Sequence, residues 1–139
     1  MTNYIALLRG INVSGKNKIK MVDLKQLFLD LGFTKVITYI QSGNVIFSSE
    51  VMTISKIEKT IIDEVKKQFD YSIKVLVLKK KELESVFMLN PFIKDTTLDL
   101  KKLGVTFLKE KPTEEGITKV KALATKDELL IFKDKTAYL

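Results

Sequence analysis

Residues 34–48 read TKVITYIQSGNVIFS, and this stretch decides the fold class. Residues 34–40 are rich in β-branched and aromatic side chains, as strands are, and residues 45–48 are apolar again. Residues 41–44, between them, have the amide, hydroxyl and glycine composition of a turn. The stretch therefore predicts a β-hairpin.

Two amphipathic helices are predicted to flank this hairpin. Upstream, apolar residues recur at helical spacing and Gly32 supplies a left-handed stop: Met21, Leu24, Leu27, Phe28 and Leu31. Downstream, a longer apolar stripe lies opposite a face of Lys, Asp and Glu: Ile54, Ile57, Ile61, Ile62, Val65 and Phe69. With predicted strands at residues 4–8 and 73–78, the order becomes βαββαβ. We therefore expect an α+β protein whose N-terminal half is a ferredoxin-like split βαβ sandwich.

The rest of the chain predicts a smaller C-terminal αβ extension. A short helix with Leu83, Val86 and Phe87 should end before Asn90-Pro91, because the residue before proline is pushed out of helical geometry. Further elements are a strand at 103–108, an ambiguous segment at 113–124 with helical spacing, and a hairpin of residues 129–132 and 136–139 that turns at Asp134-Lys135. We expect halves at 1–80 and 81–139 that pack into one compact unit.

Composition excludes several classes of function. The chain of 139 residues contains neither Cys nor His, so disulfides, thiolate nucleophiles, Ser-His dyads and sites for a metal bound by Cys or His are ruled out. Any enzyme would depend on carboxylate, Lys, Tyr or hydroxyl groups, which makes catalysis less expected than binding. The formal net charge of +7 favours anionic partners, although Arg9 is the single Arg among 24 basic residues and lysines also suit a solvated surface.

The sequence indicates a soluble, cytoplasmic protein without a membrane segment, since no stretch approaches the ~20 apolar residues that span a bilayer. No set of spaced carboxylates resembles a metal cage, so neither a metal nor another cofactor is predicted.

A glycine- and lysine-rich loop follows the first predicted strand. Residues 9–20 carry four cations, Arg9 and three lysines, without one acid, and Gly10 and Gly15 free the backbone to expose amide groups, as in an anion site. The segment 10–17 nearly matches the phosphate-binding G-x-x-x-x-G-K-[ST] loop. We reject that assignment because Asn17 replaces the magnesium-binding hydroxyl, the next helix starts late, and no apolar strand ending in Asp supplies the second metal contact.

A looser site for phosphate or another anion is the preferred hypothesis, with the anion on a nucleotide or nucleic acid as one form. The predicted ligand-binding residues are Arg9, Gly10, Asn12, Gly15, Lys16 and Lys18, with Ser42 and Asn44 as lesser contributors. The alternative is that the glycines and the 41–44 segment only shape turns. We also expect the end of the first strand and the 41–44 hairpin to lie at opposite poles of the sheet, so that a joint site would need a loop folding across.

Other functions stay open at this point. RNA-recognition modules stack bases on sheet aromatics, but their sequence signature is absent; Tyr4 and Tyr39 are the platform candidates, although single strand tyrosines mostly pack, and Phe47 is predicted in the core. An enzyme acting on a phosphorylated small molecule would use Lys16 electrostatically. A protein-assembly module would self-associate through an unpaired edge of the C-terminal strand.

Residues 4–13, 15–21 with Leu24, and 38–45 closely resemble the bacterial domain of unknown function 1697 family, and residues 90–92 and 105–108 continue the resemblance more weakly. The resemblance implies an intracellular α+β protein without an assigned activity. Ser14 stands where the family often has glycine, and the family's C-terminal Thr-x-Arg-Asn-Trp signature is lacking. We therefore expect a natural short form or a truncated version without part of the site.

Overall fold

The computed structural model describes residues 1–39, 43–88, 105–108, 110–123, 131–133 and 135–138. The chain divides into two compact units, Met1–Leu83 and Glu84–Leu139. The predicted α+β class is confirmed, because helices accompany an antiparallel sheet in each unit. The packing of the two halves into one body stays a prediction.

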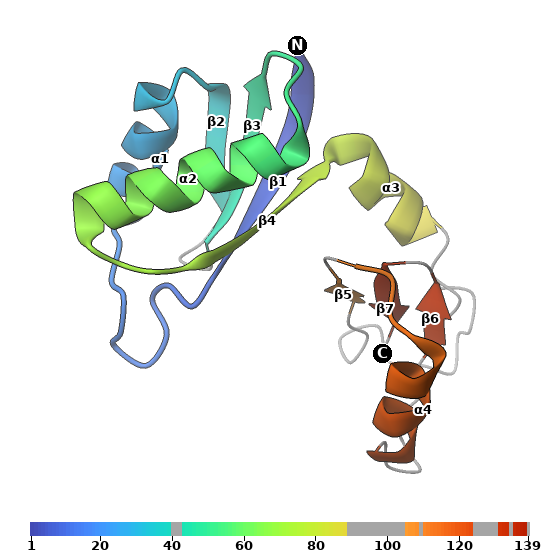
Figure 1. Ribbon diagram of the computed structural model, residues 1–139. Coiled ribbons are helices and arrows are strands. Elements are labelled where there is room, and N and C mark those ends of the chain that lie inside the picture. The colour runs from blue at the N-terminus through green and yellow to red at the C-terminus, as the bar shows by residue number, and fades with distance from the viewer. Residues whose placement is uncertain (40–42, 89–104, 109, 124–130, 134, 139) are drawn as a thin grey trace. The chain divides into compact units, whose positions relative to one another are not determined.

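Unit 1 contains a four-stranded sheet in the order β2-β3-β1-β4, with every neighbouring pair antiparallel. Its elements are β1 (Thr2–Arg9), α1 (Met21–Asp30), β2 (Thr34–Tyr39), β3 (Asn44–Ser49), α2 (Ile54–Phe69) and β4 (Lys74–Lys79). The predicted hairpin is confirmed as β2 and β3, and both predicted helices are present. Figure 1 shows α1 and α2 on the same side of this sheet.

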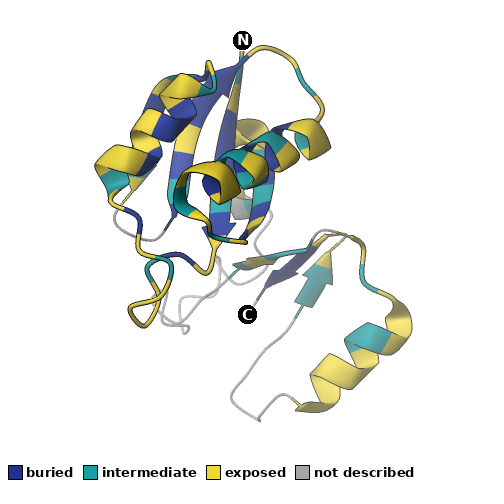
Figure 2. Cartoon of the chain, turned by 60° about the vertical axis from the view of Figure 1, so that its left-hand side comes forward, coloured by how far each residue is buried: buried dark blue, intermediate teal, exposed yellow. Residues whose placement is uncertain are grey.

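The core of unit 1 lies between the helices and one face of the sheet, which we call the covered face. Alternate residues of β1 and β3 point into it, and Phe47 is fully buried as predicted. The Phe47 ring lies 4.6 Å from that of Phe33, 5.2 Å from that of Phe28 and 5.6 Å from that of Tyr4, measured between ring centroids. In Figure 2 the sheet-facing sides of the helices are buried and their outer sides are exposed. This aromatic cluster fixes which face of the sheet the helices cover.

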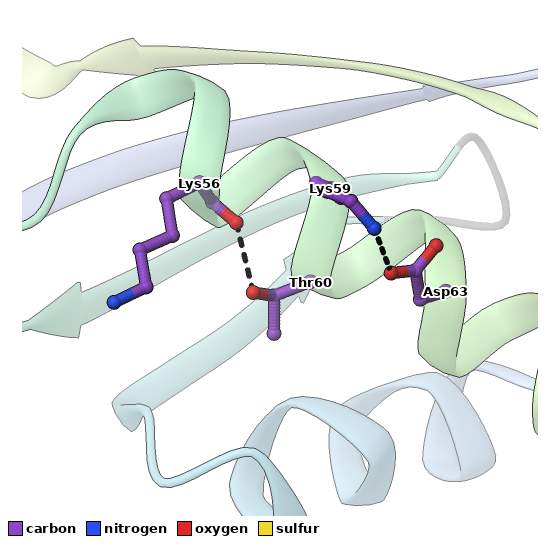
Figure 3. Close-up of polar contacts among 4 residues, drawn as sticks. All are labelled: Lys56, Lys59, Thr60 and Asp63. Atoms are coloured by element: carbon purple, nitrogen blue, oxygen red, sulfur yellow. Dashed lines mark hydrogen bonds and ion pairs between the residues drawn. The ribbon is translucent and has the colours of Figure 1, made fainter.

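Local signals set the ends of both helices. Gly32 follows Leu31, the C-cap residue of α1, and has a φ of +89°, as expected of a left-handed stop. The Thr53 hydroxyl accepts a 3.3 Å hydrogen bond from the Lys56 amide at the start of α2. On the outer side of α2, Lys59 pairs with Asp63 at 2.8 Å, which raises the pKa of Lys59, chiefly through the hydrogen bond (Figure 3). These exposed contacts place the solvated face of α2 away from the sheet.

Both edges of this sheet carry a protective feature. Glu58 of α2 is buried, and its carboxylate accepts a 2.9 Å hydrogen bond from the Val77 amide of edge strand β4. On the other edge, β2 is irregular between Thr34 and Ile37, where Lys35 adopts a φ of +51°. A side chain bound to an edge amide and a bulge each hinder pairing with another strand.

Unit 2 contains a three-stranded antiparallel sheet in the order β5-β7-β6. Its strands are β5 (Val105–Phe107), β6 (Ile131–Lys133) and β7 (Thr136–Tyr138), and its helix α4 spans Glu114–Leu123, so the ambiguous segment is helical. The helix α3 (Lys80–Met88) begins in unit 1 and ends in unit 2. Tyr138 is buried and its hydroxyl donates a 2.9 Å hydrogen bond to the Val86 carbonyl. Burial raises the pKa of Tyr138 above its ordinary value.

The place of β7 corrects one expectation about assembly. The predicted hairpin of β6 and β7 forms, but β7 also pairs with β5 on its other side. The last described strand is therefore the central strand of its sheet and offers no unpaired edge. Self-association stays a prediction, but β7 cannot supply the surface for it.

Candidate functional site at the basic end of unit 1

The loop of residues 10–20 leaves β1 and folds back on itself. Asn12 bonds both ends of the Ile19 backbone: its side chain accepts from the Ile19 amide at 2.9 Å and donates to the Ile19 carbonyl at 3.0 Å. Asn17 donates from its side chain to the Gly10 carbonyl at 3.0 Å. Gly10 and Gly15 have φ values of +83° and +74°, so the predicted conformational role of the glycines is confirmed. The two asparagines hold the loop closed.

This internal bonding limits how many backbone amides the loop exposes, while the predicted anion site stays a prediction. The amides of Asn12 and Lys16 donate to the carbonyls of Asn17 and Val13, at 3.1 and 2.9 Å, and the Ile19 amide is taken by Asn12. Three amides of the loop are therefore committed within it. Helix α1 begins at Met21, five residues beyond Lys16, in agreement with the rejection of a phosphate-binding P-loop. Any anion held here would depend mainly on side-chain cations.

Arg9 ends β1, and its register partner in the neighbouring strand is Lys74 at the start of β4. Residues directly opposite each other in an antiparallel pair point to the same face, so both cations share one face at one end of the sheet. Both side chains are exposed, and among the described residues neither takes part in an ion pair. Like charges directly opposite each other are destabilising in a sheet, so this pair is a local source of repulsion.

Asn44 lies at the same end of the sheet, which corrects the expectation of opposite poles. It begins β3 and is the register partner of Leu7, two residues before Arg9. The hairpin of β2 and β3 ends up beside the end of β1 because β3 runs antiparallel to β1 and starts where β1 stops. No loop has to fold across the sheet. Alternation along β1 puts Leu7 and Arg9 on the same face, and Asn44 shares that face as the register partner of Leu7.

Gly43 explains how tightly the hairpin meets β1. The Leu8 amide donates to the Gly43 carbonyl at 2.9 Å, and a Cβ on Gly43 would lie 2.8 Å from the Leu8 carbonyl oxygen and 3.0 Å from the Ile11 side chain. Its φ is +77°. Glycine is therefore required at this position, both for the close approach and for the backbone conformation. Ser42, the other predicted contributor, lies outside the described residues.

The loop that carries the exposed residues Lys16 and Lys18 lies at the same end of the sheet (Figure 1). Lys16 and Lys18 flank Asn17, which is bonded to Gly10 next to Arg9. The Lys18 carbonyl also accepts a 3.1 Å hydrogen bond from the Tyr71 hydroxyl, just ahead of β4. Figure 1 shows the loop below the sheet, where β1 ends and β4 begins. We call Arg9, Lys16, Lys18, Asn44 and Lys74 the basic end.

Sequence reasoning missed Lys74 and Glu58. Lys74 lies inside the predicted strand at 73–78 and was not singled out, and only the register places it opposite Arg9. Glu58 looked like part of the solvated face of α2, and no local signal marks its burial. Among the described residues, no group of three or more acidic side chains could hold a metal ion, and no described helix is long and apolar enough to cross a membrane.

Comparisons with known proteins place the chain in a family. A solved structure, that of the conserved bacterial protein SP0830 from Streptococcus pneumoniae, matches with a TM-score of 0.79 and 29% sequence identity, covering 99% of this chain and 76% of that one. A search of curated proteins found no match. The model of the family described as Protein of unknown function (DUF1697) matches residues 1–138. The expected resemblance is confirmed, and the chain belongs to this family.

Proposed function

We propose that the protein binds a phosphate-containing anionic ligand at the basic end of unit 1. The observation that carries the proposal is the direct cross-strand pairing of Arg9 with Lys74. Two exposed cations held side by side repel each other, and a multivalent anion placed between them removes that repulsion. Arg9 adds a planar guanidinium that can contact two oxygens of one phosphate, whereas Lys74 acts as a point charge.

The surrounding residues suit such a ligand. Lys16 and Lys18 extend the positive region, and residues 9–20 contain no acid that would compete for the cations. Asn44 adds an amide that can hydrogen-bond an anion or the group attached to it. Asn12 and Gly10 have supporting roles in this proposal, because their hydrogen bonds with Ile19 and Asn17 keep the loop closed.

The proposal includes a fold assignment for unit 1 as a ferredoxin-like split βαβ sandwich. The order β2-β3-β1-β4, the antiparallel pairing and the placement of both helices on one face support it. In such an arrangement the second face of the sheet carries no helix. That face is the one on which Arg9, Asn44 and Lys74 lie.

Calorimetric titration with inorganic tripolyphosphate tests the proposal. The Arg9→Ala/Lys74→Ala variant should bind at least about tenfold more weakly than the unaltered protein, since each charge-assisted contact contributes about 1.5 kcal/mol or more. The matched control is Lys25→Ala/Lys56→Ala, which removes the same charge from exposed positions on α1 and α2. Equal losses in both variants would show that net charge alone is responsible, and absence of binding in the unaltered protein would reject the proposal.

A further inference from the structure

The face of the unit 1 sheet opposite α1 and α2, which we call the open face, is apolar next to the basic end (Figure 1). Strand register places one row of residues across it: Leu78, Ile5, Ile46 and Ile37. The next row toward the basic end contains Leu76, Leu7, Asn44 and Tyr39. Arg9 and Lys74 follow in the row after that.

Exposure concentrates on the β2 and β3 side of these rows. Ile37 is 60% exposed, Tyr39 is 64% exposed and Ile46 is 38% exposed. Ile37 and Ile46 are register partners, so the three side chains form one contiguous apolar and aromatic surface. Tyr39 differs in this respect from Tyr4, which is fully buried against Phe47. Of the two tyrosines considered as base platforms, Tyr39 is therefore the exposed one and Tyr4 belongs to the core.

Charge on the open face has a single sign. By register, the described residues that point to it include Arg9 and Lys74 but no Asp or Glu. A second copy of the chain docked by the same face would bring these cations into one interface without an acid to pair with them, which is costly. The occupant has to supply both negative charge and flat apolar groups.

From this juxtaposition we infer that the open face binds single-stranded nucleic acid, with bases against Tyr39, Ile37 and Ile46 and the backbone phosphates on Arg9 and Lys74. The inference rests on the proposed anion site and names its ligand class. Single strands offer unpaired bases that stack on aromatic and apolar side chains, next to phosphates that attract cations. A duplex hides its base faces and should bind less well.

The test is fluorescence anisotropy with labelled RNA and DNA single strands of about ten nucleotides, a typical length for one small binding face. Tyr39→Ala should weaken binding of either strand about tenfold, while Tyr39→Phe should retain it, because stacking needs the ring and not the hydroxyl. Val22→Ala, an exposed apolar residue on α1, is the matched control and should change nothing. Circular dichroism spectra confirm that each variant is folded.

Tripolyphosphate binding separates the two proposals. If Tyr39→Ala loses the single strand but keeps tripolyphosphate, and Arg9→Ala/Lys74→Ala loses both, the inference holds. If the single strand binds no better than an abasic backbone of the same length, or binds independently of Tyr39, the inference is overturned while the anion site stands. If neither tripolyphosphate nor the strand binds, both proposals fall.

Discussion

The two faces of the unit 1 sheet are built from alternate residues of the same four strands, yet they differ in burial. The covered face packs Phe47 and Tyr4 against the helices and leaves them fully buried. The open face leaves Ile37 and Tyr39 largely exposed and ends in a pair of cations. A strand with apolar residues on both sides thus shows that hydrophobicity alone does not assign a residue to the core, because α1 and α2 both pack on the same face (Figure 1).

The largest expected effect is on stability, and it compares Phe47 with Ile46, which are neighbours in β3 but point to opposite faces of the sheet. Phe47→Ala removes a side chain that contacts three other rings, and we expect it to lower the free energy of unfolding by about 4 kcal/mol. Ile46→Ala, one residue away on the open face, should cost about 1 kcal/mol or less. Urea denaturation followed by circular dichroism measures both. Equal losses would mean that the open face is packed as tightly as the covered one.

Substitution of Gly43 tests whether the close approach of the β2–β3 hairpin to β1 requires glycine. Gly43→Ala puts a Cβ against the Leu8 carbonyl at a φ of +77° and should cost about 2 kcal/mol or more. Gly10→Ala has a similar φ of +83° but no atom within 4 Å, so it should cost about 1 kcal/mol. Urea unfolding midpoints compare the two variants. The same cost for both would remove the close approach of hairpin and β1 as the cause.

Glu58 provides a test on the covered face, because it is a buried acid on the helix that packs there. Glu58→Ala leaves the Val77 amide without this acceptor and should destabilise the protein by about 2 kcal/mol. Glu58→Gln keeps an acceptor oxygen and should lose about half of that. Thermal denaturation distinguishes them, and hydrogen exchange at Val77 should accelerate in the Ala variant alone. A neutral Ala variant would mean that this bond does not protect the β4 edge.

The smallest expected change in stability concerns the basic end. There, one substitution should raise stability and weaken anion binding at the same time. Lys74→Glu turns the cross-strand repulsion with Arg9 into an attraction and should stabilise the protein by about 0.5 kcal/mol. The same change should weaken tripolyphosphate binding more strongly than Lys74→Ala, since it places an acid in the site. Urea unfolding measures the change in stability, and calorimetry measures the change in tripolyphosphate binding. A variant that loses stability would show that the two cations are already compensated.

Much of the fold was predictable because its signals are local. The stripes of α1 and α2, the Gly32 stop and the β2–β3 hairpin depend on side-chain periodicity and backbone preference within a few residues. The burial of Glu58 was not predictable, since it depends on the Val77 amide nineteen residues away. Likewise the central place of β7 depends on β5, which is distant in the sequence.

The candidate site also has one part that is predictable from the sequence and one part that is not. Its chemistry, a run with Arg9 and several lysines but no acid between residues 9 and 20, is a property of the sequence alone. Its geometry is not: the register of antiparallel strands brings Lys74 opposite Arg9 and Asn44 opposite Leu7. Composition and periodicity thus determined which groups the chain possesses and which local elements it forms. Only the tertiary structure decided which of those groups meet, because pairing between strands depends on the fold of the whole unit and not on neighbouring residues.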